Sequence, residues 1–98
     1  MTNAPETHAA SATLYRARIY VSLKSTVNDP EGETIASALR SLGFDSVQSV
    51  RSGKYFQVLL SAASEQEARA AVDAMCRRLL ANPVIETYEF ELREAQPA

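Results

Sequence analysis

Residues 46–62 read SVQSVRSGKYFQVLLSA, and this stretch decides the predicted fold. Its second half, Lys54 to Ala62, alternates and has β-branched and aromatic content, which predicts a strand. That strand carries apolar residues on both faces, a pattern typical of strands buried on both sides. Ser46 to Arg51 predicts a short strand with an irregular start. Ser52-Gly53 between them predicts a hairpin turn.

The residues before this stretch predict one more strand and a helix. Tyr15 to Lys24 alternates, so it predicts a strand with one buried face. A turn cluster at Asn28 to Gly32 follows. After it, four apolar residues recur at helical spacing and form one stripe, which ends at Gly43, where a left-handed cap fits. The stripe consists of Ile35, Ala38, Leu39 and Leu42.

The residues after the stretch predict a second helix and a last strand. Ser64 and Glu67 have the spacing of a capping box, and an apolar stripe runs on from Ala68 to Leu80, including Cys76 and Leu79. Asn82-Pro83 ends this helix, because proline disfavours helical geometry in the residue before it. Val84 to Arg93 alternates and predicts the final strand.

The resulting order, βαββαβ, predicts an α+β, ferredoxin-like domain. We expect a four-stranded antiparallel sheet in the order 4-1-3-2, with both helices on one face. Arg16 and Arg18 on the first strand should then lie beside Glu89 and Glu91 on the last. The domain covers residues 14–94, between a flexible N-terminal tail at 1–13 and a C-terminal tail at 95–98.

Length and composition exclude several classes of protein. A chain of 98 residues is too short for a TIM barrel or a two-domain dinucleotide enzyme. The net charge of −2 provides no general attraction to nucleic acid or anionic lipid. No apolar run approaches the ~20 residues of a membrane span. The N-terminus has no signal-peptide pattern, and a single cysteine cannot form an internal disulfide, so we expect a cytoplasmic protein.

No set of residues in the sequence predicts catalysis on this chain. Cys76 lies on the apolar face of a helix, and the single histidine, His8, lies in the tail. One cysteine and one histidine cannot build a tetrahedral zinc site. Ser52-Gly53-Lys54 lacks the rest of a phosphate-binding loop. We therefore expect no catalytic residue, no metal ligand and no bound cofactor on this chain.

The sheet face away from the helices is predicted to be a contact surface. It carries large side chains amid charges, whereas a single helix layer leaves that face in water. These side chains are the predicted self-association face: Tyr20, Tyr55, Leu59 and Ile85.

Several stretches resemble the PurS family, the small subunit of bacterial phosphoribosylformylglycinamidine synthase. The resemblance spans Tyr15 to about Leu92 and is most specific in the hairpin VRSGK at 50–54 and the run LLANPVIE at 79–86. It implies a non-catalytic subunit in purine biosynthesis that forms a homodimer or homotetramer. It also implies that the chain bridges a glutaminase subunit (PurQ-like) and a synthetase subunit (PurL-like). In that position the chain would assist assembly of the complex or transfer of ammonia between the two subunits. The complex would use ATP and glutamine.

Two predicted tips carry family-matching residues without an evident role in the core, so we expect them to face the larger subunits. These residues are Arg51, Gly53, Lys54, Asn82, Pro83, Val84 and Glu86. Two other functions use the same topology. An RNA-recognition module stacks bases on aromatic residues of the sheet, as Tyr20 and Tyr55 could. A small-molecule regulatory domain would need glycine-rich binding loops, which this chain lacks.

Overall fold

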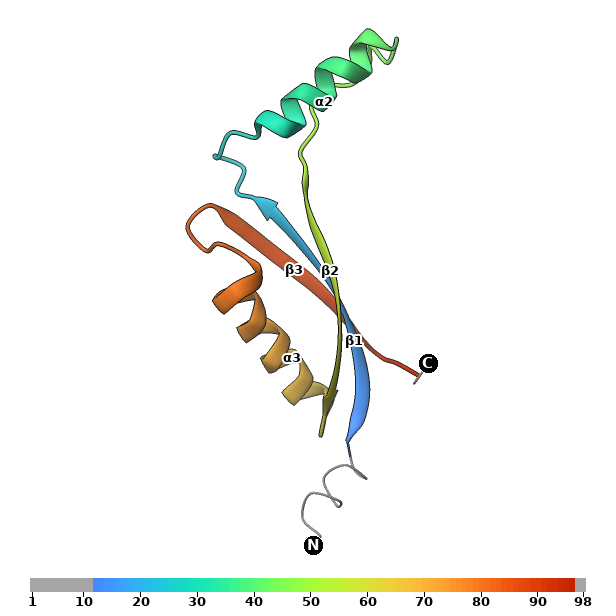
Figure 1. Ribbon diagram of the computed structural model, residues 1–98, viewed down its shortest axis with the longest axis vertical. Coiled ribbons are helices and arrows are strands. Elements are labelled where there is room, and N and C mark those ends of the chain that lie inside the picture. Colours follow the sequence, from blue (N-terminus) through green and yellow to red (C-terminus); the bar gives the residue numbers. More distant parts are fainter. Residues whose placement is uncertain (1–11, 97–98) are drawn as a thin grey trace, which may run out of the picture.

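The computed structural model of the chain describes residues 12–96, which form a three-stranded sheet, two α-helices and one π-helical turn (Figure 1). Most of the predicted N-terminal tail, and His8 with it, lies outside the described residues. The elements are β1 (Thr13–Leu23), α2 (Pro30–Ser41), β2 (Gly53–Ala62), α3 (Glu65–Met75), η1 (Cys76–Leu80) and β3 (Glu86–Glu94).

The sheet is antiparallel, and β1 lies in its centre, in the order β2-β1-β3. The predicted alternation of β1 is confirmed, because its core-facing residues Tyr15, Ala17, Ile19 and Val21 are all buried. Ile19 lies opposite Phe56 of β2 and Phe90 of β3, and both are packed against the core. On the other face, the predicted charge pairing is confirmed for Arg18, which lies opposite Glu91, but Arg16 lies opposite Arg93.

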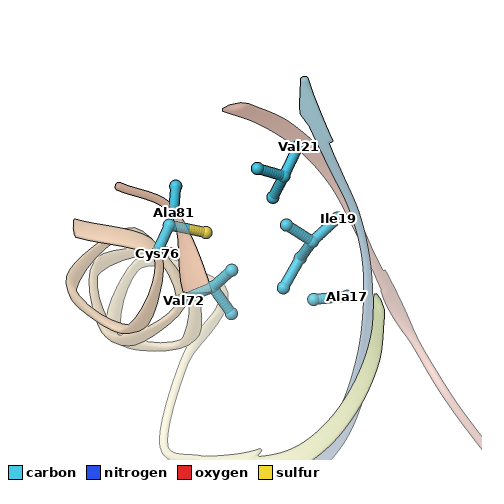
Figure 2. Packing of buried hydrophobic residues seen from close by; sticks show 6 residues of the cluster. All are labelled: Ala17, Ile19, Val21, Val72, Cys76 and Ala81. Carbon is cyan, nitrogen blue, oxygen red and sulfur yellow. The ribbon is translucent and has the colours of Figure 1, made fainter. Parts of the chain in front are cut away.

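The sheet is covered on one face by α3. Ser64 caps this helix, because its Oγ accepts a hydrogen bond from the Glu67 amide at 3.1 Å. One turn apart, Val72 and Cys76 point from the helix toward Ala17, Ile19 and Val21 of β1 (Figure 2). This small contact between one helix and one strand is the hydrophobic core.

The predicted apolar stripe of the second helix is wrong at its end. From Cys76 the chain forms a π-helical turn, in which the Ala81 amide bonds to the Cys76 carbonyl five residues back. Leu79 lies inside this turn and is 83% exposed, while Leu80 still packs against the core and Ala81 is buried.

The predicted four-stranded sheet is also wrong, since the described residues contain no strand at 46–51 and no hairpin at Ser52-Gly53. Gly53 is instead the first residue of β2, and Gly43 is the only described glycine with a positive φ, at 102°. A two-residue hairpin of the usual type needs a positive φ in its turn. After the turn that follows α2, the chain therefore runs back and continues into β2 without a second reversal (Figure 1).

The first helix, α2, does not cover the sheet either, because it projects past the end of the sheet together with residues 42–52 (Figure 1). We call residues 30–52 the arm. The radius of gyration is 19.0 Å, against about 13 Å for a compact chain of 100 residues. The molecule is therefore elongated, and α2 has little contact with the other described helices and strands.

Candidate interaction surfaces

The joint between the arm and the sheet is built on Asp29. This residue is only 3% exposed, and its carboxylate accepts hydrogen bonds from the amides of Gly32 at 2.9 Å and Ser52 at 2.7 Å. The Ser52 hydroxyl donates a further bond at 3.1 Å. These donors, the Ser52 amide first, lower the pKa of Asp29. Asp29 thus caps α2 and also holds the chain that returns from the arm.

Arg51 completes this joint. Its Nη2 donates hydrogen bonds to the carbonyls of Lys24 at 3.0 Å and Val27 at 2.9 Å. The expectation that Arg51 has no role inside the domain is therefore wrong. An Asp followed by proline at a helix start is an N-cap signature, so the sequence could have indicated Asp29 as a cap. No local pattern could have shown that Ser52 is its second partner.

The structure brings the two predicted tips together at the end of the sheet next to the arm. Lys54 lies 3.5 Å from a carboxylate oxygen of Glu86, and the Asn82 amide donates to the other Glu86 oxygen at 2.7 Å. Asn82 in turn accepts from the Val84 amide at 2.9 Å. The turn at 82–85 takes Val84 and Ile85 out of the predicted final strand, which begins at Glu86.

Val84 is the most exposed apolar residue of the turn at 82–85, at 75%, and its neighbour Ile85 is exposed as well. The same end of the sheet carries the exposed cation Lys54 and the largely buried carboxylate of Glu86. We call Lys54, Asn82, Pro83, Val84 and Glu86 the sheet-end surface. It combines an apolar centre with a charged border, which is the usual anatomy of a protein interface.

The open face of the sheet carries three of the four residues predicted for self-association. Tyr20 and Tyr55 lie opposite each other on β1 and β2, with ring centroids 5.2 Å apart, and both are partly exposed. Leu59 lies opposite Arg16 on the same face. The fourth residue, Ile85, lies in the turn before β3. Glu89 lies opposite Tyr20, and its carboxylate would repel an RNA phosphate there.

Metal-ligand clusters and the single cysteine can be checked directly in the described residues. Within 12–96, no three His, Cys, Asp or Glu residues gather closely enough to hold a metal ion. Burial raises the pKa of the Cys76 thiol, and the nearby Asp73 carboxylate adds to this. A raised pKa disfavours the thiolate that a nucleophile needs. No helix of this part of the chain has the length and apolar character to cross a membrane.

A polar cluster between α3 and β3 contains the remaining shifted groups. The Tyr88 hydroxyl donates to Asp73, which also pairs with Arg77 at 2.8 Å. The hydrogen bond from Tyr88 lowers the pKa of Asp73 and raises the pKa of Tyr88 itself. The cluster attaches the outer side of α3 to β3, and this structural role accounts for its contacts.

Comparison with known proteins identifies the family. The model of the family PurS, phosphoribosylformylglycinamidine (FGAM) synthase, matches residues 16–94. The chain belongs to the PurS family. A phosphoribosylformylglycinamidine synthase subunit PurS from Synechocystis is 46% identical over 84 residues, which cover 86% of this chain and 84% of the relative. The predicted family is thereby confirmed.

Solved PurS structures have the same fold. PurS from Methanocaldococcus jannaschii, described as one of the subunits of formylglycinamide ribonucleotide amidotransferase in the purine biosynthetic pathway, matches with a TM-score of 0.75 and 38% identity. The match covers 84% of this chain and 99% of that one. A chain in the structure of PurLQS from Thermotoga maritima matches with a TM-score of 0.72 and 38% identity, over 84% and 98% of the two chains.

Proposed function

We propose that this chain is the non-catalytic small subunit of phosphoribosylformylglycinamidine synthase and that it holds the glutaminase and synthetase subunits together. The observation that carries the proposal is its likeness to a chain of PurLQS from Thermotoga maritima, over nearly the whole of that chain. The relatives are subunits of FGAM synthase by name. Purine biosynthesis is therefore the pathway, and the cytoplasm is the expected location.

The absence of a suitable nucleophile or metal cluster in residues 12–96 supports a role in assembly. The amidation requires glutamine hydrolysis and ATP, and we assign both to the larger subunits. This chain contributes contacts that place the two subunits next to each other and so assist ammonia transfer. We assign the contact with the larger subunits to the sheet-end surface and self-association to surfaces of the sheet and arm.

Reconstitution from the three purified subunits tests this function. We expect glutamine-dependent synthesis to require the chain, while synthesis from added ammonium chloride by the synthetase subunit continues without it. A matched control is the same mixture with the glutaminase subunit omitted, which should lose only the glutamine-dependent reaction. If both reactions stop when this chain alone is omitted, it supplies something to the amidation itself, and a purely assembling role is wrong.

We propose that the open face forms a second self-contact, which joins two dimers of this chain into a tetramer. Leu59→Glu places a charge in its centre, where the free chain leaves Leu59 exposed and folding is little affected. Light scattering should show a smaller mass for the largest assembly of the variant than for that of the unchanged chain. An unchanged mass would remove the open face from the interface.

A further inference from the structure

The open face of the sheet carries opposite charges at its two ends. At the end next to the arm, Glu89 of β3 lies opposite Tyr20 of β1. Four residues further along β3, Arg93 lies opposite Arg16 of β1. Among the described residues, neither Glu89 nor either of these arginines forms an ion pair. The open face is therefore acidic at one end and basic at the other.

The basic end is unfavourable in a single chain. Arg16 and Arg93 are direct cross-strand neighbours, and like charges in this position destabilise a sheet. On the other side of Arg16, the opposite residue of β2 is Leu59, which supplies no carboxylate. The two guanidinium groups therefore favour an acidic group that comes from outside this sheet.

The acidic end has the complementary chemistry. A hollow of about 260 Å³ lies there, lined by Tyr20, Glu89, Phe90 and Glu91. Tyr55 lies beside Tyr20, with 5.2 Å between the ring centroids. Carboxylates form strong hydrogen bonds with a guanidinium group, and the face of a tyrosine ring attracts the same cation. This end of the open face therefore suits an arginine side chain.

We propose that the open faces of two copies of this chain pack in opposite directions, with the basic end of each copy on the acidic end of the other. A two-fold axis that runs across the strands at the level of Arg18 and Glu91 gives this arrangement. It places each strand over its counterpart, so that Glu89 of one copy meets Arg93 of the other. This proposal rests on the second self-contact proposed above and specifies its orientation and its charged contacts.

The same axis brings the other side chains of the face into favourable contacts. Tyr20 of one copy lies over Arg16 of the other, where the ring attracts the guanidinium group. Tyr55 of one copy lies over Leu59 of the other, so these apolar groups cover each other. At the axis, each copy contributes one cation and one carboxylate, because Arg18 lies opposite Glu91 within each sheet.

A two-fold axis along the strands would give a poorer match. Because β2 and β3 are the two edges of the sheet, such an axis places β3 of one copy over β2 of the other. Glu89 then meets Tyr55, and Arg93 meets Leu59, so neither charge gains an opposite partner. Charge complementarity therefore selects the axis that runs across the strands.

The salt dependence of the assembly tests whether charges hold this contact. At about 1 M salt, charges are screened beyond ~3 Å, so the contact should weaken. We expect light scattering on the unchanged chain to show the largest assembly falling to half its mass as sodium chloride is raised. A mass that stays at its low-salt value would show that charges do not hold the two faces together, and the proposal would be wrong.

Charge reversal tests the contact between Glu89 and Arg93. Arg93→Glu leaves only glutamates at the two positions, and Glu89→Arg leaves only arginines, so copies of either variant repel each other. We expect neither variant alone to form the larger assembly. An equimolar mixture of the two should restore it, because each position then meets the opposite charge. The double variant Glu89→Arg, Arg93→Glu should restore it within a single kind of chain.

Two controls separate loss of the contact from loss of folding. Arg93→Glu removes one of two neighbouring arginines, so the melting temperature of this variant should not fall. Glu94→Arg makes the same change as Glu89→Arg on the same strand but on the other face, since Glu94 lies opposite the buried Tyr15. This control should keep the mass of the unchanged chain.

The results distinguish the orientation of the two faces from the self-contact itself. If the single reversals keep the larger assembly, or if neither the mixture nor the double variant restores it, the proposed orientation is wrong. A smaller mass for Leu59→Glu would in that case still place a self-contact on the open face. If Leu59→Glu also keeps the mass of the unchanged chain, or if the unchanged chain forms nothing larger than a dimer, the second self-contact is wrong as well.

Discussion

At the scale of single residues, Asp29 determines how the arm meets the sheet. The pH dependence of the chain's stability tests this role. Its folded-state pKa lies below the ordinary value of about 3.9, so its contribution to stability is complete above that pH and is lost as the pH falls through the lower folded-state pKa. In Asp29→Asn, we expect a lower melting temperature at pH 7 and a smaller drop between pH 5 and 2. The measurement is thermal unfolding by circular dichroism.

Asp73 needs a control in this experiment, because its pKa is lowered as well. Asp73→Asn should also reduce the acid-dependent drop, but through the contact between α3 and β3. Hydrogen exchange separates the two sites, since Asp29→Asn should loosen residues 24–33 and 50–53 and leave the end of α3 protected. If the pH profile of Asp29→Asn equals that of the unchanged chain, Asp29 does not stabilise the joint through its charge.

Arg51 is predicted to stabilise the joint, whereas its neighbour Lys54 is not. Arg51→Ala leaves the Lys24 and Val27 carbonyls without their donor, so we expect a lower melting temperature and faster hydrogen exchange at residues 24–29. Arg51→Lys should rescue little, since a lysine lacks the rigid guanidinium fork. Lys54→Ala is the control, because the Lys54 side chain is mostly exposed and Glu86 keeps its hydrogen bond from the Asn82 amide. Equal effects of Arg51→Ala and Lys54→Ala would contradict this division.

At the scale of elements, stability depends on the contact between β1 and α3. Ile19 is fully buried against Val72 and Cys76, so Ile19→Ala should lower the free energy of unfolding by about 2–5 kcal/mol. Leu59→Ala, on the exposed face of the neighbouring strand, should lower it far less. Chemical denaturation of both variants checks the difference. A small loss for Ile19→Ala would mean that the core lies elsewhere.

The elements could be predicted from the sequence because their signals are local. The alternation of β1, the Ser64 cap and the stripe of the second helix each lie within one segment, and they are confirmed, the stripe only as far as Cys76. The stripe of α2 correctly indicates a helix, but periodicity does not show which surface covers it. The sequence around Ser52-Gly53 suits a closed hairpin and an extended hinge equally well. The bonds of Asp29 and Arg51, over separations of more than twenty residues, decide between them.

The candidate site residues also divide into those that local sequence patterns predict and those that only the three-dimensional structure brings together. Exposure of Tyr20, Tyr55 and Leu59 follows from alternation, and the structure shows it. Ile85 is exposed too, but it lies in the turn before β3 and not on the predicted strand. The meeting of Lys54 with Glu86 required the three-dimensional order of the strands, although the family resemblance had already selected both residues. Arg51 was selected for the wrong reason, because a sequence cannot show that a surface cation binds two backbone carbonyls of its own chain.

At the scale of the whole molecule, the sheet-end surface is predicted to contact the larger subunits. Val84→Glu changes a side chain that is 75% exposed, so the isolated chain should keep its melting temperature. In the reconstituted enzyme, burying an unpaired charge should weaken binding of the chain by at least tenfold. We therefore expect a higher concentration of the chain to be needed for half-maximal glutamine-dependent activity, with ammonia-dependent activity unchanged. Activity at saturating Val84→Glu chain should approach that of the unchanged protein, because the contact positions subunits and supplies no catalytic group. A reduced maximum at saturation, with normal binding, would instead show that the sheet end acts in ammonia transfer and would remove it from the binding interface.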